Sequence, residues 1–267
     1  MRADGRVASQ TARPRQPPGG CHRLLLTAAA ALAATALFPT MPSPGAKFRA
    51  ALAAESPLQL AGAINAYDAL LAQRAGFRAL YLSGAGVANH SYGLPDNGQT
   101  ELAEVLIDVR RITGRVALPL LVDIDTGWDD PANAVREMAA AGAAAVEGVP
   151  AAIARAQAYV AAGADMNFAE ALHTLEDYRA FTAAVKAPVL ANLTEFGQTP
   201  YFTVAELRSV GVALALYPLS ASRATAAASL EVYTALRRDG THASVVGKMQ
   251  TRADLYATLG YTPPKAQ

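Results

Sequence analysis

From Leu58 onward, short apolar runs alternate along the chain with longer segments whose apolar residues recur at helical spacing. The apolar runs are nearly continuous instead of alternating with polar positions, which is typical of parallel strands buried on both faces. We expect strands within residues 58–65, 77–86, 118–125, 164–171, 187–197 and 212–220. We expect helices between and after them, at 66–76, 101–114, 131–142, 175–185, 203–211, 221–238 and 242–259.

The regular alternation of strand and helix predicts an α/β fold. Several expected strands finish in small or polar residues, as in the stretches LSGAG, VDID and ANLTEFG. Polar residues at the carboxyl ends of successive strands favour a (β/α)-barrel of the TIM type over a doubly wound sheet. No GxGxxG motif opens a helix after the first strand and no Walker-type loop is present, so nucleotide binding is not favoured.

The composition allows a large core and gives no sign of a strongly charged partner. Of 267 residues, 52% are hydrophobic and 17% are charged, and the formal net charge is +1. This balance gives no basis for binding nucleic acid or an anionic membrane. The one cysteine, Cys21, excludes a disulfide framework or a cysteine-rich zinc site within the chain, and we expect no chemistry from it.

The first 42 residues differ from the rest, because a basic stretch rich in Pro and Gly precedes a short apolar run, LLLTAAAALAATALF. This order resembles a secretory signal, and the run is too short for a membrane-spanning helix. The alternative is untranslated upstream sequence, with the true start at Met41. We expect an extension at 1–42, a barrel at 43–240 and a C-terminal helix and tail at 241–267. We expect a cytoplasmic protein, although the extension leaves export or organelle import open.

The stretch LLVDIDTGWDD carries two aspartates at the end of an expected strand. Asp123 and Asp125 are two residues apart, so their side chains point to the same side of the strand. Two carboxylates that converge there would repel each other unless a cation lies between them, and Mg²⁺ fits because it prefers oxygen ligands. The alternative, turn formation or helix capping by aspartate, explains Asp129 or Asp130 well and Asp123 poorly.

A second group of candidates surrounds the expected strand ends. Ser83, Gly84 and Ala85 follow a strand directly, where small residues let backbone N–H groups approach a carboxylate or phosphate, although an ordinary turn would look the same. Further polar residues lie in or just after apolar segments, and the two arginines suit bidentate capture of carboxylates: Glu170, Asn192, Thr194, Arg223 and Arg252. His90 and His173 have no partner at metal-ligand spacing and are expected at the surface.

Taken together, these stretches resemble the isocitrate lyase/phosphoenolpyruvate mutase superfamily, and within it the methylisocitrate lyase branch. The resemblance runs in order from Ser43 to about Tyr261. The segments that carry it are YLSGAGVANHSYGLPD, RRITGRVALPLLVDIDTGW, RAQAYVAAGADMNFAEA, PVLANLTEFGQTP, ALYPLSASRA and MQTRADLY.

The resemblance implies a Mg²⁺-dependent barrel enzyme that assembles as a tetramer with a helix exchanged between neighbouring barrels. Such enzymes split a 2-hydroxy tricarboxylate into succinate and an α-keto acid, which is pyruvate for methylisocitrate in propionate catabolism. By match of motif, Asp123 and Asp125 correspond to the metal-shell carboxylates. Ser83, Gly84 and Ala85 correspond to the loop that binds a substrate carboxylate, with Ala85 in place of a usual glycine. The five polar residues of the later strand ends correspond to other substrate-binding positions.

The chain departs from the family's pattern at one junction, where GAAA runs directly into VEGVP near Glu147. In the family, the fourth strand ends in a metal-shell glutamate, and a loop with the catalytic cysteine and a fifth strand follow. Roughly fifty residues are therefore missing from a fold that typically needs about 250. Glu147 does not replace the lost glutamate, because its neighbours match a later segment, and no cysteine follows Cys21.

We therefore expect an incomplete barrel, with about six strands plus a stub at 143–147 and a seam between the strands at 118–124 and 164–169. Lyase activity should be strongly impaired, because a proton donor and part of the metal shell are lost together. Two alternatives remain. The chain is a non-catalytic protein that binds dicarboxylates or joins the tetramer of an intact paralogue, or the gap is a splicing or gene-model error.

Overall fold

The structure of the chain is a computed structural model, and it describes residues 42–124, 127–140, 145–147, 156–157, 160–161, 163–169 and 172–262. Among these residues, no helix is both long enough and apolar enough to cross a bilayer. Residues 1–41, which make up nearly all of the expected N-terminal extension, lie outside the described part.

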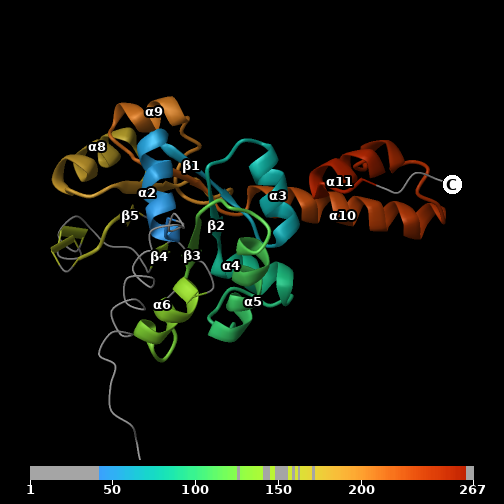
Figure 1. Cartoon of the computed structure of the whole chain (residues 1–267). Coiled ribbons are helices and arrows are strands. Elements are labelled where there is room, and N and C mark those ends of the chain that lie inside the picture. Colours follow the sequence, from blue (N-terminus) through green and yellow to red (C-terminus); the bar gives the residue numbers. More distant parts are fainter. Residues whose placement is uncertain are drawn as a thin grey trace, which may run out of the picture. The chain divides into compact units, whose positions relative to one another are not determined.

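The described strands form one parallel sheet in the order β4-β3-β2-β1-β7-β6-β5, which curls into a half-barrel (Figure 1). The strands are β1 (Leu58–Gly62), β2 (Ala79–Leu82), β3 (Leu120–Asp123), β4 (Ala145–Glu147), β5 (Asn167–Ala169), β6 (Val189–Asn192) and β7 (Leu214–Tyr217). Six of them lie within the expected strands, and β4 lies within the expected stub. The predicted incomplete barrel is therefore confirmed.

The seam lies where it was expected. Among the described strands, β4 pairs only with β3, with Asp123 opposite Glu147, and β5 pairs only with β6. In the described part of the sheet, β4 and β5 are therefore the two edges, and each is three residues long. Short edge strands limit the row of unpaired backbone groups that could recruit another chain.

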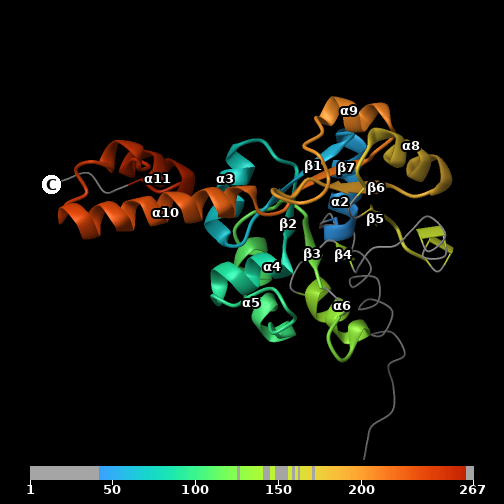
Figure 2. The same cartoon turned by 180° about the vertical axis from the view of Figure 1, so that it is seen from behind.

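Helices flank the sheet in two groups, while the last two helices extend away from it (Figures 1 and 2). One group lies beside β1, β2 and β3, and the other lies beside β5, β6 and β7. The helical segments are α2 (Pro44–Ala54), α3 (Ala66–Arg74), α4 (Gly84–Gly86), the π-helical turn η1 (Val87–Ser91), α5 (Leu102–Thr113), α6 (Pro131–Ala140), α8 (Leu175–Ala184), α9 (Val204–Ser209), α10 (Ser220–Asp239), the 3₁₀ turn η2 (Val246–Lys248) and α11 (Arg252–Leu259).

Alternate residues of each strand separate the core into an inner and an outer part. The inner cluster lies on the concave side of the sheet and packs against α2; its buried members are Phe48, Ala51, Leu58, Leu60, Ala79, Tyr81, Leu121, Leu190, Leu214 and Leu216. The residues between them, such as Leu80, Leu120 and Ala191, belong to two outer clusters under the covering helices. This alternation decides which side chains at the strand ends face the concave side.

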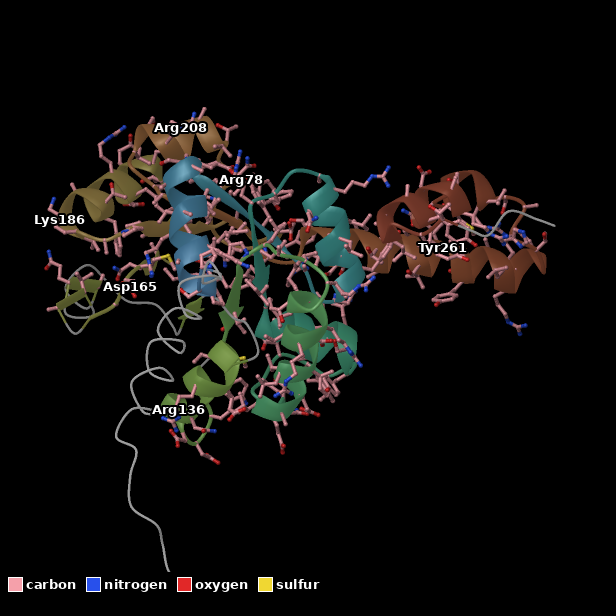
Figure 3. The ribbon with its side chains drawn as sticks, in the orientation of Figure 1. Arg78, Arg136, Asp165, Lys186, Arg208 and Tyr261 are labelled. Atoms are coloured by element: carbon pink, nitrogen blue, oxygen red, sulfur yellow. The ribbon has the colours of Figure 1, made fainter. Side chains whose placement is uncertain are left out.

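Two close contacts fix the geometry around β1. A Cβ at Gly62 would lie 1.8 Å from the carbonyl oxygen of Pro218, so only glycine lets the ends of β1 and β7 approach in this way. Arg208 of α9, labelled in Figure 3, donates from Nε to the carbonyl oxygen of Ser56 at 2.7 Å, and this bond joins α9 to the segment that leads into β1.

Three local expectations differ from the structure. The helix expected at 242–259 begins only at Arg252, because the Thr251 side chain caps it by accepting from the N–H of Asp254, while Gly240 ends α10 in a left-handed conformation. The turn expected after β2 is helical over α4 and η1. α2 was not assigned from the sequence, although Ser43 and Pro44 form a recognisable helix start.

Candidate active site at the carboxyl ends of the strands

The candidate residues that the structure describes collect mainly at one edge of the sheet. Asp123 is the last residue of β3, Ser83 follows β2, and Asn192 is the last residue of β6. Because all strands run parallel, their carboxyl ends lie at the same edge, which is where barrel enzymes place their active sites. Asp125 and Glu170 lie outside the described residues.

Asp123 faces the concave side of the half-barrel. It lies two residues after Leu121, which belongs to the inner cluster, so both side chains point to the same face. The hydroxyl of Tyr81, another member of that cluster, donates to Oδ2 of Asp123 at 3.0 Å. The carboxylate is therefore oriented by β2 and presented inside the curl of the sheet. Its predicted role as a metal ligand stays a prediction.

The loop after β2 is tightly packed. Ser83 is 5% exposed and its hydroxyl accepts from the N–H of Gly86 at 3.3 Å, which caps α4. Gly84 is buried and Ala85 is half-buried. A Cβ at Gly86 would lie 2.2 Å from Cδ1 of Ile64, so a larger residue would push this loop outward. The small residues thus let the backbone of the loop lie close to the end of β1.

Arg223 lies in the first turn of α10 and contacts the loop that follows β6. Its Nε is 3.5 Å from Oε2 of Glu195, and Ser220 donates to the other oxygen of the same carboxylate. Asn192 and Thr194 lie on the same segment, so the structure brings Arg223 to the candidate residues of β6. Glu195 was not predicted as a site residue, although it directly follows Thr194 in the polar end of an apolar run.

Arg252 is not joined to this group by any hydrogen bond or ion pair among the described residues. It is exposed at the start of α11, which packs against α3. The contact includes a hydrogen bond of 2.6 Å from the Tyr67 hydroxyl to Gln250. His90 and His173 are exposed, as expected from the sequence.

Two titratable groups near the strand ends have shifted pKa values. Burial raises the pKa of Asp68 on α3, against the opposing effects of a backbone hydrogen bond from Ile64 and the positive charge of His90. Burial also raises the pKa of Tyr217 at the end of β7. Both residues line a pocket of about 480 Å³ between α3, β1, β7 and the start of α10. This pocket was not predictable from the sequence, because its lining residues come from four separate segments.

Within the described ranges, no three His, Cys, Asp or Glu side chains gather to hold a metal ion. Asp123 alone among the predicted metal ligands is described there, since Asp125 is not. Mg²⁺ commonly takes one or two protein carboxylates together with waters and substrate oxygens. The carboxylate at the end of β3 fits such a site as one ligand, and Glu147 ends the neighbouring strand β4 in register with it.

Comparison with known proteins extends over most of the chain. The sequence model of the phosphoenolpyruvate phosphomutase family matches residues 48–148 and 145–237. The chain is 47% identical to a 2-methylisocitrate lyase of Shewanella oneidensis over 274 residues, which cover 82% of this chain and 94% of the relative. It is also 47% identical to a 2-methylisocitrate lyase of Escherichia coli over 275 residues, with 82% and 93% covered.

These matches also locate the gap. The alignment of 274 positions is longer than the whole chain of 267 residues, although it uses only 82% of it. Many aligned positions of the relative therefore have no counterpart here. The two family matches meet at residues 145–148, which contain β4. The internal deletion predicted from the sequence is thus confirmed at the junction where it was expected.

Solved structures agree with the fold. A 2,3-dimethylmalate lyase, described as a PEP mutase/isocitrate lyase superfamily member, matches with a TM-score of 0.75 and 24% identity, covering 82% of this chain and 96% of that one. A phosphonopyruvate hydrolase in complex with oxalate and Mg²⁺ matches with a TM-score of 0.70 and 25% identity, covering 82% and 95%. With the half-barrel and the sequence matches, these findings show that the chain belongs to the PEP mutase/isocitrate lyase superfamily, among the relatives of the 2-methylisocitrate lyases.

Proposed function

We propose that this chain is a lyase of the 2-methylisocitrate type that binds its tricarboxylate substrate at the strand ends but cleaves it far more slowly than an intact relative. The observation that carries the binding half of the proposal is the concave-facing carboxylate of Asp123, held by Tyr81 at the edge where Arg223 also meets the β6 loop. The 47% identity to named 2-methylisocitrate lyases supports the substrate class.

The roles of the residues follow from the chemistry of the substrate. Arg223 would bind a substrate carboxylate through its guanidinium, and Asn192 and Thr194 would donate hydrogen bonds to the same group or to its neighbour. The loop of Ser83, Gly84 and Ala85 would hold a second carboxylate through backbone N–H groups. Glu170, and Arg252 if α11 approaches the site in the assembled protein, would complete the contacts. Such contacts orient the bond that breaks.

Mg²⁺ is the proposed cofactor, with Asp123 and Asp125 as its protein ligands. When bound, the ion would act as a Lewis acid and stabilise the negative charge on the substrate hydroxyl oxygen as its proton leaves. The relative solved with oxalate and Mg²⁺ supports this choice. Mg²⁺ should raise the thermal midpoint of wild type more than that of Asp123→Asn, and equal shifts for both proteins would contradict the assignment.

Impaired turnover is proposed because the chain has no counterpart of the cysteine that the resemblance implies as proton donor for the second product. After the carbon–carbon bond breaks, the succinate carbanion must take up a proton, and the cysteine loop that resemblance assigns to this step falls in the deletion. The one cysteine of the chain is Cys21, in the N-terminal segment. A positioned acid typically contributes about 10²–10⁴-fold to a rate, so we expect at least that loss.

The test compares this chain with the Escherichia coli 2-methylisocitrate lyase, with 2-methylisocitrate as substrate and with Mg²⁺ or a chelator present. Pyruvate release measures cleavage, and calorimetry measures binding. We expect binding in both proteins and turnover lower by about 10²-fold or more in this chain. Turnover close to that of the relative would refute the proposed impairment. Sequencing the transcript across Ala145 and Glu147 would decide whether the deletion is present in the message.

A second candidate function, binding without catalysis, is favoured by the same deletion. A pseudoenzyme would bind succinate or pyruvate and release no product. Detectable cleavage that is lost in Asp123→Asn would exclude this candidate, whereas binding with no cleavage above the uncatalysed rate would support it. We propose a cytoplasmic location for either case, and no nucleic acid or membrane partner.

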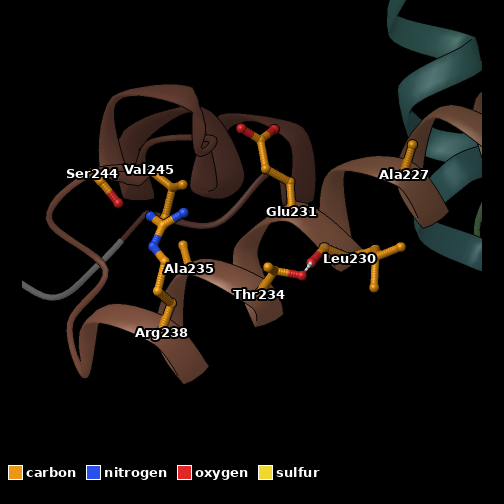
Figure 4. A pocket seen from close by; sticks show the side chains of 8 residues that line it. All are labelled: Ala227, Leu230, Glu231, Thr234, Ala235, Arg238, Ser244 and Val245. Carbon is orange, nitrogen blue, oxygen red and sulfur yellow. Dashed lines mark hydrogen bonds between the residues drawn. The ribbon is translucent and has the colours of Figure 1, made fainter.

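We propose further that the chain forms a homo-oligomer, a tetramer as the resemblance implies, in which α10 packs on a neighbouring copy. Exposed apolar side chains support this, since Leu230 is 67% and Tyr233 is 69% exposed on α10. A pocket of about 460 Å³ runs along the helix between α10 and the turn that follows it (Figure 4). Light scattering after size-exclusion chromatography should give a molecular mass that is a multiple of 27.7 kDa, and Tyr233→Asp should lower this mass. A monomeric wild type would contradict this assembly.

A further inference from the structure

The loop after β6 holds Arg223 from two directions. Oε2 of Glu195 lies 3.5 Å from Nε of Arg223, and the ring centroid of Phe196 lies 5.5 Å from Cζ of the same guanidinium. Ser220 donates a hydrogen bond to Oε1 of Glu195, so the carboxylate itself is held at its second oxygen. We call Glu195, Phe196 and Ser220 the arginine clamp.

The clamp leaves one edge of the guanidinium available. Among the described residues, the terminal nitrogens Nη1 and Nη2 of Arg223 make no hydrogen bond, while Nε faces Glu195. The arginine side chain is 43% exposed and that of Glu195 is 25% exposed, so this pair is not sealed in the core. A guanidinium held at Nε can still bind a carboxylate with its two terminal nitrogens. Glu195 therefore holds Arg223 at Nε and does not occupy the terminal nitrogens that would bind the substrate.

The backbone of the loop is strained in a way that serves this contact. Phe196 has a φ of 62°, in the left-handed region that bulky residues rarely adopt, and it is 86% exposed. Its N–H donates to the hydroxyl of Tyr201 at 3.1 Å, which holds the turn in place. Because the Phe196 ring is exposed, it contributes little to the core that would offset the cost of this backbone conformation. The ring instead lies against the guanidinium of Arg223.

We propose that Glu195 is a positioning residue that acts through Arg223. With Ser220 and Phe196, it fixes the guanidinium so that the terminal nitrogens face a carboxylate of the bound ligand. The clamp itself rests on the geometry of the loop alone. The identity of the ligand, a 2-hydroxy tricarboxylate, rests on the proposed function.

The first test needs no ligand and measures how fast phenylglyoxal modifies Arg223, by mass spectrometry of the peptide. The ion pair with Glu195 and the ring of Phe196 restrain the guanidinium, so Glu195→Gln should free it and raise the rate about twofold to fivefold. The control is Glu176→Gln, which removes an exposed partner 3.6 Å from Arg179 on α8 and should leave the Arg223 rate unchanged. An unchanged rate in Glu195→Gln would overturn the clamp.

The second test measures binding of 2-methylisocitrate by calorimetry in the full chain with Mg²⁺ present. Glu195→Gln should weaken binding about tenfold, and Glu195→Asp should recover part of it. In an Arg223→Ala background, Glu195→Gln should add no further loss, because a residue that acts only through Arg223 has no effect without it. Additive losses, or tighter binding in Glu195→Gln, would overturn the positioning role. If wild type binds no 2-methylisocitrate, the proposed function fails. The phenylglyoxal modification rates alone then decide whether Glu195 holds Arg223.

Discussion

The central strands and the edge strands of the sheet differ in how completely they are supported. β1 pairs with β2 on one side and β7 on the other, and residues such as Leu60 and Leu216 are fully buried. β4 and β5 have three residues each, and within the described sheet each pairs on one side only. Phe168 of β5 is only partly buried. In its described part, the sheet is thus paired on one side only at β4 and β5 and on both sides at every other strand.

This difference shows that each strand of a parallel sheet is stabilised mainly by the strands directly beside it. Every pairing from β3 through β1 to β6 is intact. Among the described strands, only β4 and β5 lack a partner on one side. A barrel that is opened in this way can therefore still present Asp123, Ser83 and Arg223 at one edge.

The strongest test of the comparison is native-state hydrogen exchange. Backbone amides of Leu58–Gly62 should exchange only in global unfolding, while those of Asn167–Ala169 should open locally. We expect the edge strand to exchange at least about a thousandfold faster, which corresponds to about 4 kcal/mol. Mass spectrometry of peptic peptides would measure both segments in one sample. Equal protection of the two segments would mean that the seam is closed by another copy or by residues outside the described part.

Core truncation should show the same contrast with a smaller effect. Leu60→Ala removes a fully buried side chain from the inner cluster and should lower the free energy of unfolding by about 2–5 kcal/mol. Phe168→Ala should cost about 1 kcal/mol, because the ring is only partly buried and its surroundings can relax. Urea denaturation followed by circular dichroism would compare them. A larger loss for Phe168→Ala would reverse our ranking of the two regions.

Helix caps on the two sides of the sheet allow a finer comparison. Thr174 caps α8 and accepts from the N–H of Asp177 at 3.1 Å, while Asn65 caps α3 and accepts from the N–H groups of Tyr67 and Asp68. Each change to alanine should cost about 1 kcal/mol. We expect Thr174→Ala to speed exchange only in α8 and its neighbours, and Asn65→Ala only in α3 and its neighbours. If either variant loosened both sides equally, the two sides would unfold as one unit.

The smallest expected effect is a pH dependence from Asp68. Its pKa is raised in the folded protein, chiefly by burial, so the folded state holds its proton more tightly than the unfolded state does. Stability should therefore fall as pH rises from the ordinary aspartate pKa through the raised one. Asp68→Asn should remove that part of the slope, which urea midpoints between about pH 4 and pH 7 would reveal. A wild-type slope retained in the variant would assign it to another group.

The sequence predicted the strands well because buried parallel strands leave long apolar runs. The expected segments were longer than the observed strands, since apolar residues such as Ala63 and Ile64 continue into the loops and pack there. The helix expected from residue 242 failed for a local reason, because Val245, Val246 and Gly247 disfavour a helix before the cap at Thr251.

The candidate site was predictable only in part. Asp123, Ser83 and Asn192 were recognisable because a polar or small residue ends an apolar run. Glu195 was not, because its role depends on the left-handed backbone at Phe196 and on the distant start of α10, and neither is visible in residue spacing. Contacts between segments far apart in the chain are set by the fold and leave no local pattern.

The strand β4 has a wider meaning for how such chains change length. Its residues lie in the overlap of the two family matches. The same three positions therefore belong to the end of the first matched segment and to the start of the second. When two segments of similar apolar character are joined, residues of the second segment can therefore form the strand that pairs with β3. Engineers who wish to shorten repeating α/β scaffolds could choose such interchangeable boundaries as cutting points.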